Sequence, residues 1–493
     1  MGKVFKESLL TTVFSYIGVI IGYINMLWLL PFVLNPSQIG LFKTIQDMGL
    51  ILVPFAQLGL GNGITRFYPE VKRHQFSFFT LSLVISSIGF TLVALLFFAF
   101  RDSIMSAYQT NSPEVNNFLL VVLLITLFSV FNTILDAFCR SFMKIAIPSF
   151  FRDVFLRVMI ALLIIFHYIG WLSFDHLIWG LSAVYLFTLL AMTLYMASNR
   201  ILKFDFNFKV LPRAFQKEFF QYSFITLLAT TGALLIAKID SLMVTSLIGL
   251  EANAVYAIAF AMAVVIEMPR RAVSQVVMPV IAEKFSLNQT RDIDLLYKNM
   301  AVNQSLVCVL IFLLIWVNVD SLYHFVPNSE IYQTGKWVVL LISLGKLTDV
   351  FFSINGEIII FSRYYLFNVT ATLLMCAVVI LLNLWFIPVY GIEGAALSSL
   401  IAMFFFNLIK YVYIKVRLGF DPFSGDLAKV LFLGLMLFFL DYVSPKVDMV
   451  LLDLLLRSSL LLFLYGLGIY IMNIAKEAQF MLLTKFREWY KGF

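Results

Sequence analysis

The sequence predicts an all-α polytopic membrane protein with about 14 transmembrane helices. Two of the observations behind this prediction come from composition: 61% of the 493 residues are hydrophobic and only 13% are charged. A soluble domain carries roughly twice that share of charge. The third observation is that apolar runs of about 20 residues, the length that crosses a bilayer as a helix, recur along the whole chain. Because lipid offers no hydrogen-bond partner, such runs must be helices.

The apolar runs follow one another with short connections, which leave no room for a large soluble domain. The first run is too long for a signal-peptide core and no cleavage site follows it, so we expect it to remain as the first span. A β-barrel is disfavoured because its segments alternate in polarity, whereas these runs are continuous. The predicted spans are 8–33, 39–63, 77–100, 115–139, 146–168, 176–198, 219–248, 253–282, 299–318, 335–360, 366–388, 394–414, 427–444 and 450–473.

Positive charge is distributed unevenly between the connections. With the N-terminus placed in the cytoplasm, three of the 35 lysines and arginines fall in outside segments: Arg101, Lys336 and Lys446. The inside segments include the basic stretch 199–217 and the inner end of the twelfth span, with Lys410. Lysine and arginine concentrate in cytoplasmic loops. We therefore expect a multi-pass protein of the bacterial cytoplasmic (inner) membrane, with the N- and C-termini cytoplasmic.

Two stretches of the chain look alike. Residues 34–69 and 248–279 each contain a short outside turn, a long span and a proline near the inner end, and they lie six spans apart. An even offset gives both copies the same orientation, which is a known plan for transporters. We therefore predict an N-terminal six-helix lobe (1–208), a C-terminal six-helix lobe (209–417), and two additional transmembrane helices with a basic cytoplasmic tail (418–493).

Several ionisable residues lie inside predicted spans, where charge is costly, and each is therefore a functional candidate. Lys43–Asp47 and Glu267–Arg271 are spaced four residues apart, which puts both groups of a pair on one helix face. Because arginine binds phosphate through paired hydrogen bonds, we assign the cations to substrate binding in a cationic cavity: Arg270, Arg271, Lys238, Arg152, Arg157, Lys43 and Lys346. We assign the acids to ion coupling or charge balance: Asp47, Asp240, Glu267, Asp349 and Glu357. Ion pairs that only join helices are the alternative.

Motifs for nucleotide or metal chemistry are missing from the sequence. There is no G-x-x-x-x-G-K-[ST] and no HExxH, so no catalytic residue, metal site or cofactor is predicted, and a proton or Na⁺ gradient is the expected energy source. The longest outside loops, 101–114 and 319–334, are too short for a catalytic domain, which argues against an enzyme. The net charge of +7 lies in short loops and does not indicate nucleic acid. Cys139, Cys308 and Cys376 fall in apolar runs and are expected to pack without forming disulfides.

Three blocks of sequence carry a resemblance to a known family. They are Asn35-Pro-Ser-Gln-Ile-Gly-Leu-Phe42 at the start of the second span, Leu58-Gly-Leu-Gly-Asn-Gly-Ile-Thr-Arg-Phe-Tyr-Pro-Glu70 at its inner end, and Asn383-Leu-Trp-Phe-Ile-Pro-Val-Tyr-Gly-Ile-Glu-Gly-Ala-Ala396 between spans eleven and twelve. In the order and spacing of these blocks, the chain resembles the polysaccharide transporters of the MOP superfamily, the Wzx-type flippases. The resemblance covers nearly the whole chain in layout.

The resemblance implies two six-helix bundles around a central cavity that opens alternately to each side of the membrane. It implies transport of a lipid-linked oligosaccharide, on a carrier like undecaprenyl diphosphate, from the inner to the outer leaflet. Membrane lipid and the glycan assembly machinery are further partners that fit this role. Gly59 and Arg66 lie at the inner end of the second span, where the glycines make the helix pliable, and we expect them to belong to an inner gate.

Two other branches of the superfamily and an enzyme are alternatives. Multidrug exporters of this superfamily, which are ion-coupled, usually carry an acidic residue in the first span, and lipid II flippases tend to carry Arg and Asp there. Here the first span holds Asn25 and no charge. Fourteen spans, however, are more typical of lipid II flippases than of Wzx-type proteins, which more often have twelve. A membrane enzyme or an assembly partner for glycan synthesis is the third alternative.

Overall fold

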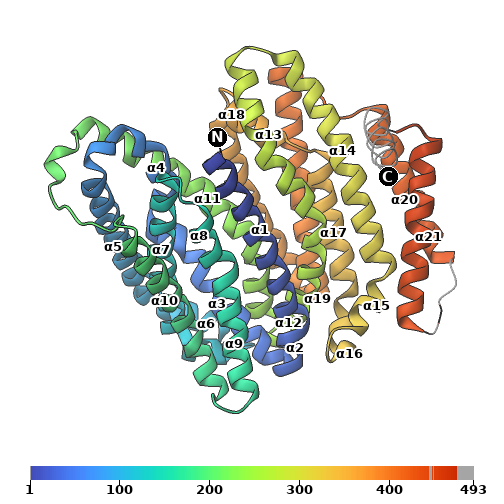
Figure 1. The fold of residues 1–493 in the computed structure, drawn as a ribbon. Helices are drawn as coiled ribbons and strands as arrows, with labels where there is room; N and C mark the ends of the chain where they lie inside the picture. Colours follow the sequence, from blue (N-terminus) through green and yellow to red (C-terminus); the bar gives the residue numbers. More distant parts are fainter. Residues whose placement is uncertain (1, 444–446, 448, 475–493) are drawn as a thin grey trace. The chain divides into compact units, whose positions relative to one another are not determined.

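The computed structural model describes residues 2–443, 447 and 449–474 of the chain. Every regular element of these residues is a helix (Figure 1), which confirms the predicted all-α class. The first helices are α1 (Gly2–Ile24), α2 (Leu30–Val33), α3 (Pro36–Gln57), α4 (Leu60–Phe67), α5 (Gln75–Ala99), α6 (Arg101–Gln109), α7 (Leu119–Ser141), α8 (Ala146–Ser149), α9 (Leu156–Tyr168), α10 (Phe174–Ser198) and α11 (Arg213–Leu247). The basic tail predicted at the C-terminus, with Lys476 and Lys485, lies outside the described residues.

The remaining α-helices are α12 (Leu250–Val264), α13 (Met268–Ser286), α14 (Thr290–Val317), α15 (Val319–His324), α16 (Ser329–Tyr332), α17 (Lys336–Phe351), α18 (Asn355–Phe361), α19 (Tyr365–Leu418), α20 (Gly425–Val443) and α21 (Val450–Ile471). Two π-helical segments also occur, η1 (Asn25–Leu29) and η4 (Phe150–Phe155). Short 3₁₀ segments connect other helices, among them η6 (Val265–Glu267). Each predicted span overlaps at least one of these helices.

Within the described part of the chain, 9 helices are long and apolar enough to cross a membrane, or up to 11 if each of two bent pairs is one span. The protein is therefore a multi-pass membrane protein, and the predicted count of 14 stays a prediction. One reason for the lower number is that α19 covers the predicted spans 366–388 and 394–414 as one helix kinked at Gly391 (φ 63°, ψ −139°). Another is that the predicted span 146–168 is divided among α8, η4 and α9.

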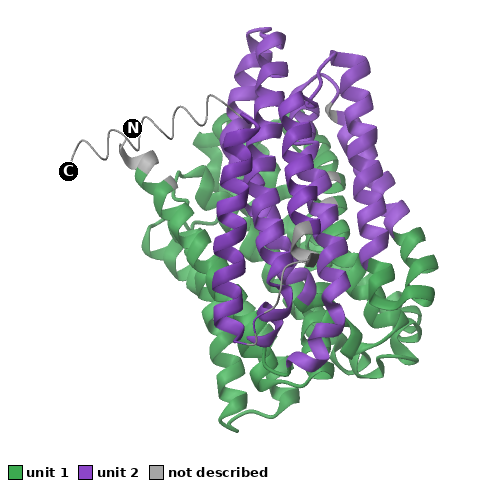
Figure 2. Ribbon diagram, turned by 90° about the vertical axis from the view of Figure 1, so that its right-hand side faces the viewer, with its two compact units in different colours: residues 1–258, 326–328, 380–395 green, residues 259–325, 329–379, 396–493 purple. Residues whose placement is uncertain are grey.

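The described chain forms two compact units, coloured separately in Figure 2. Unit 1 consists of residues 1–258, 326–328 and 380–395, and unit 2 of residues 259–325, 329–379 and 396–493. The helices α12 and α19 each contribute to both units. The predicted lobes divide the chain at other positions and remain a prediction.

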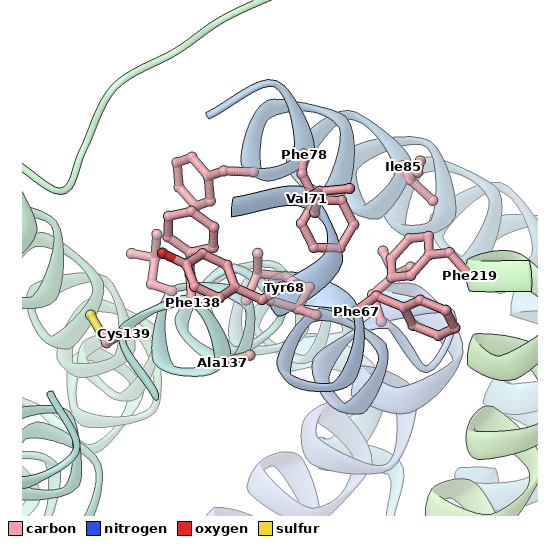
Figure 3. Close-up of a cluster of buried hydrophobic side chains, with 14 of the residues drawn as sticks. Phe67, Tyr68, Val71, Phe78, Ile85, Ala137, Phe138, Cys139 and Phe219 are labelled. Atoms are coloured by element: carbon pink, nitrogen blue, oxygen red, sulfur yellow. The ribbon is translucent and has the colours of Figure 1, made fainter. Parts of the chain in front are cut away.

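Aromatic side chains dominate one buried cluster of unit 1, shown in Figure 3. The rings of Phe78 and Phe219 lie 5.0 Å apart between centroids, and those of Phe79 and Phe138 lie 4.4 Å apart. Phe67 meets Phe219 edge-on at 5.9 Å. Such offset and edge-to-face pairs are the favoured aromatic geometries. The cluster ties α4 to α5, α7 and α11, next to the segment in which the inner gate was predicted.

Unit 2 has its own apolar clusters. The larger one joins α14, α17, α20 and α21 through fully or nearly fully buried side chains such as Leu313, Val350, Leu433 and Leu461. The predicted packing role of the cysteines agrees with the structure, because Cys139, Cys308 and Cys376 are all buried and none forms a disulfide.

Candidate functional site

The first group of predicted charges lies in unit 1 and centres on Asp47 of α3. Lys238 of α11 donates to Asp47 Oδ1 at 2.7 Å, and Lys43 lies one helical turn before Asp47 with its Nζ 3.2 Å from the same oxygen. The Asp47 side chain is only 1% exposed. One buried carboxylate thus holds two lysines, one from its own helix as the spacing predicted and one from a helix far along the chain.

A second group lines part of a cavity of about 450 Å³ in unit 1. The Arg152 guanidinium lies 3.0 Å from Asp153 Oδ1 and 3.3 Å from Asp136 Oδ2, and Arg140 lies 2.9 Å from the same Asp136 oxygen. The Arg152 side chain is 52% exposed. The rest of the cavity wall is mainly apolar, with Leu50, Val53, Leu156, Met192 and Leu234.

The neighbouring Arg157 packs against α1. Ser15 donates to Asp153 Oδ2 at 2.9 Å, and Asn25 donates to the Arg157 carbonyl at 2.9 Å. A Cβ added at Gly18 would lie 2.3 Å from the Asp153 carbonyl oxygen, so α1 approaches η4 closely only because this residue is glycine. Our prediction did not include this contact. The G-x-x-x-G spacing of residues 18–22 was the signal that could have found it.

The third group lies in unit 2 around Arg270 of α13. Its Nη1 lies 2.9 Å from Asp349 Oδ2 on α17, and its Nη2 donates to the Ser353 carbonyl at 3.1 Å. Glu357 of α18 lies farther away, with Oε2 at 3.9 Å from Arg270 Nη2, and its other oxygen accepts a short hydrogen bond from Ser274. Arg270 is therefore a buried group held by partners on two other helices.

Glu267 connects the other predicted cations of unit 2. Arg271 donates to Glu267 Oε1 at 3.0 Å, as the four-residue spacing predicted, and Lys346 Nζ lies 2.8 Å from Glu267 Oε2. The Lys346 side chain is 14% exposed, whereas that of Arg271 is 60% exposed. Neighbouring residues in sequence thus differ sharply: Arg270 is enclosed and Arg271 is open.

Asp240 of α11 lies beside polar side chains of two other helices. It accepts hydrogen bonds from the Tyr256 hydroxyl at 2.9 Å and from the Asn383 amide at 2.7 Å, on α12 and α19 of the same unit. The residue is buried. Two of the hydrogen bonds that Asp240 accepts therefore come from neutral side chains.

The segment predicted as an inner gate contains a break between α3 and α4. Leu58 and Gly59 both adopt left-handed conformations, with φ values of 52° and 71°. A Cβ at Gly59 would lie 2.1 Å from the Ser223 carbonyl oxygen of α11. About two turns beyond this break, the Arg66 guanidinium lies 4.5 Å from the centre of the Tyr222 ring. The structure thus shows a helix break at this place, and the gating role stays a prediction.

The structure buries Lys410, which the sequence places at the inner end of the twelfth span; its side of the membrane stays a prediction. In the structure this residue of α19 is only 6% exposed, and its ammonium lies 3.7 Å from the centre of the Phe406 ring. Its position four residues inside the predicted span 394–414 was the signal that could have predicted this burial.

Comparison with known proteins adds a family and a fold. The sequence profile of the polysaccharide biosynthesis protein family matches residues 4–285. No curated protein matches the sequence significantly. Among solved structures, the lipid II flippase MurJ in an inward closed conformation is similar with a TM-score of 0.74 and 14% identity, over 94% of this chain and 98% of that chain.

Two multidrug transporters share the fold less closely. An inward-facing multidrug resistance MATE family transporter of the MOP superfamily gives a TM-score of 0.57 at 14% identity, over 82% of this chain and 94% of that chain. The Vibrio cholerae MATE transporter VcmN in its bent form gives 0.56 at 13% identity, over 85% and 98%. The fold is that of MOP-superfamily transporters, and with the family match over residues 4–285 the chain belongs to the polysaccharide biosynthesis protein family.

Proposed function

We propose that this protein is a flippase that moves a lipid-diphosphate-linked oligosaccharide from the inner to the outer leaflet of the cytoplasmic membrane by alternating access. The observation that carries the proposal is the match to the polysaccharide biosynthesis protein family in a chain with a transporter fold. The similarity in structure to the lipid II flippase MurJ supports a lipid-linked substrate. The carrier we propose is of the undecaprenyl diphosphate type.

Exposure separates the predicted cations into two groups with different proposed roles. Lys238 and Arg270 have side chains that are 23% and 12% exposed and are engaged by carboxylates on other helices. Arg152 and Arg271 keep more than half of the side chain exposed, at 52% and 60%. Each of these two guanidinium forks is held by a carboxylate, Arg152 by Asp153 and Arg271 by Glu267. An exposed fork can exchange that carboxylate for a diphosphate, which presents the same paired acceptors. We therefore assign diphosphate binding to Arg152 in unit 1 and Arg271 in unit 2, and helix joining to the buried pairs.

The acids also differ in how closely a cation holds them. Asp47, Glu267 and Asp349 are each within 3.2 Å of a cation, which fits charge balance. Glu357 accepts a hydrogen bond from the Ser274 hydroxyl, and its ion pair with Arg270 is long, at 3.9 Å. A carboxylate held by hydroxyl or amide donors can change its charge without breaking a close ion pair. We propose that transport is driven by a proton or Na⁺ gradient and that Glu357 is the better candidate for coupling.

Reconstitution tests the proposed activity directly. The full-length protein is placed in vesicles that carry lipid-linked oligosaccharide in one leaflet, and accessibility of the sugar to a membrane-impermeant lectin is followed over time. We expect transfer that depends on the protein and falls in the R152A/R271A variant. Transfer no faster than in protein-free vesicles, with drug efflux by the same preparation, would favour the multidrug exporter instead.

A further inference from the structure

Lys410 lies in the interior of unit 2 and is not used by the function proposed above. The side chain points toward α18, where a Cβ added at Gly356 would lie 3.4 Å from Lys410 Nζ. The Phe406 ring lies 3.7 Å from this nitrogen and favours a positive charge there. Among the described residues, no carboxylate oxygen lies within 4.0 Å of the ammonium and no acceptor hydrogen-bonds to it. A buried cation without such partners loses its hydration without compensation.

Glu357, the residue after Gly356, has a carboxylate oxygen without a hydrogen-bond donor. Its Oε1 accepts the hydrogen bond from Ser274, whereas its Oε2 is buried and has no hydrogen-bond partner. Arg270 is 3.9 Å from Oε2 but is already committed to Asp349 and to a backbone carbonyl. One donor group and one acceptor oxygen are thus left unmatched on adjacent helices of the same unit.

The charged groups that act on Lys410 come from three packed elements. They are Arg270 on α13, Asp349 on α17 and Glu357 on α18. From α14, the Tyr297 hydroxyl also lies near this cluster but donates to the Phe352 carbonyl at 3.1 Å. With all four charged groups ionised, the cluster is neutral. Arginine does not release its proton in proteins, and Asp349 is held by Arg270, so a proton can leave or enter only at Lys410 or Glu357 at low cost.

We propose that Lys410 is a proton-binding site of unit 2 and that Glu357 is the group that controls it. When the two side chains are apart, as here, the ammonium releases one proton to water and becomes a neutral amine. When Lys410 Nζ meets Glu357 Oε2, the amine takes up one proton and forms an ion pair. Alternation between these arrangements moves one proton per cycle, which would supply the coupling of the proposed flippase. The role in transport rests on the proposed function, but the proton binding does not.

The first test is a proton count that needs no substrate. The purified full-length protein and its K410R variant are titrated between about pH 6 and 9, the range in which tuned buried lysines change charge. Because arginine keeps the positive charge and stays protonated, we expect wild type to release one more proton per chain than K410R. The matched control is K415R. Lys415 lies on the same helix with its Nζ 2.8 Å from Asp421 Oδ2 and a side chain that is 54% exposed, so it should not change the count. Equal counts for wild type and K410R would overturn the proposal.

The second test separates coupling from binding in the reconstituted vesicles. We expect the rate of transport driven by a pH gradient to fall on the order of tenfold in K410R. Without a gradient, K410R should still equilibrate lipid-linked oligosaccharide between the leaflets. Loss of both activities, or of neither, would overturn the coupling role. If wild type moved no lipid-linked sugar at all, the proposed function would fail. The proton count would still show whether Lys410 binds and releases a proton.

Discussion

Lys238 of α11 and Asp47 of α3 are 191 residues apart in the chain and form a hydrogen-bonded ion pair at 2.7 Å. Lys43 shares the same carboxylate oxygen, at 3.2 Å. Removing one partner of a buried pair leaves an uncompensated charge, which costs more than the pair itself contributes. Asp47 should therefore be a determinant of stability in unit 1 rather than a substrate contact.

The first prediction concerns this carboxylate. D47N should lower the free energy of unfolding by about 3–5 kcal/mol because it leaves two lysines without their acceptor. K238M should cost less, since the Lys43–Asp47 pair remains. Thermal unfolding of the purified protein in one detergent measures both variants and the D47N/K238M combination. Equal stability of D47N and wild type would show that Asp47 does not hold the helices together.

The second prediction uses the difference between two adjacent arginines. R271A should fold normally and lose at least about tenfold in glycan export, because a charge-assisted contact to phosphate contributes about 1.5–3 kcal/mol. R271K should retain part of the activity, since lysine keeps the charge but not the fork. R270A should instead lower the amount of folded protein, because it leaves Asp349 unpaired. Export per amount of membrane-inserted protein separates the two effects.

The control for these variants is R291A. Arg291 is exposed on the predicted cytoplasmic side and forms no ion pair with another described residue. Its replacement should leave both export and protein level unchanged. If R291A lowered export as much as R271A, the effect would reflect general loss of positive charge and not a binding site at Arg271.

The third prediction concerns the break between α3 and α4. G59A should destabilise the protein by at least about 1–3 kcal/mol, because alanine disfavours a φ of 71° and its Cβ would meet the Ser223 carbonyl oxygen at 2.1 Å. The matched variant is G61A, whose Cβ would have its nearest contact at 3.4 Å, with a Thr133 methyl group. Because Gly61 is helical, alanine there should be neutral or slightly stabilising. Unfolding midpoints in the same detergent compare the two, and a stable G59A protein would contradict this account of the break.

The fourth prediction concerns orientation. The three native cysteines are buried, so the background of thiol labelling should be low. Lys203 and Arg101 are both exposed and lie in segments predicted to face opposite sides of the membrane. In intact spheroplasts, R101C should react with a membrane-impermeant maleimide, whereas K203C should react only after the membrane is opened. The reverse pattern would invert the predicted topology.

Local sequence patterns predicted the local features well. The apolar runs coincide with helices, and the four-residue spacings of Lys43–Asp47 and Glu267–Arg271 correspond to ion pairs. The same spacing of Asp153 and Arg157 does not, because Asp153 pairs with Arg152. These features depend only on the helical repeat, which is the same in any fold. The kink at Gly391 within α19 also falls in the block that was placed between the predicted spans eleven and twelve.

Contacts between distant helices could not be predicted in this way. Lys346 and Asp349 share a helix face, but Lys346 pairs with Glu267 and Asp349 pairs with Arg270. Which helices are neighbours decides such pairings, and one sequence does not contain that information. The same limit explains Lys410, whose burial depends on its packing against α18.

The central claim is that the protein transfers a lipid-linked oligosaccharide between leaflets. The measurement that tests it most directly is the leaflet distribution of lipid-linked intermediates in a strain that lacks the gene, together with the surface glycan profile. The account predicts loss of surface glycan with intermediates trapped in the inner leaflet, and rescue by wild type but not by R152A/R271A. Normal surface glycan with no trapped intermediate would contradict the account.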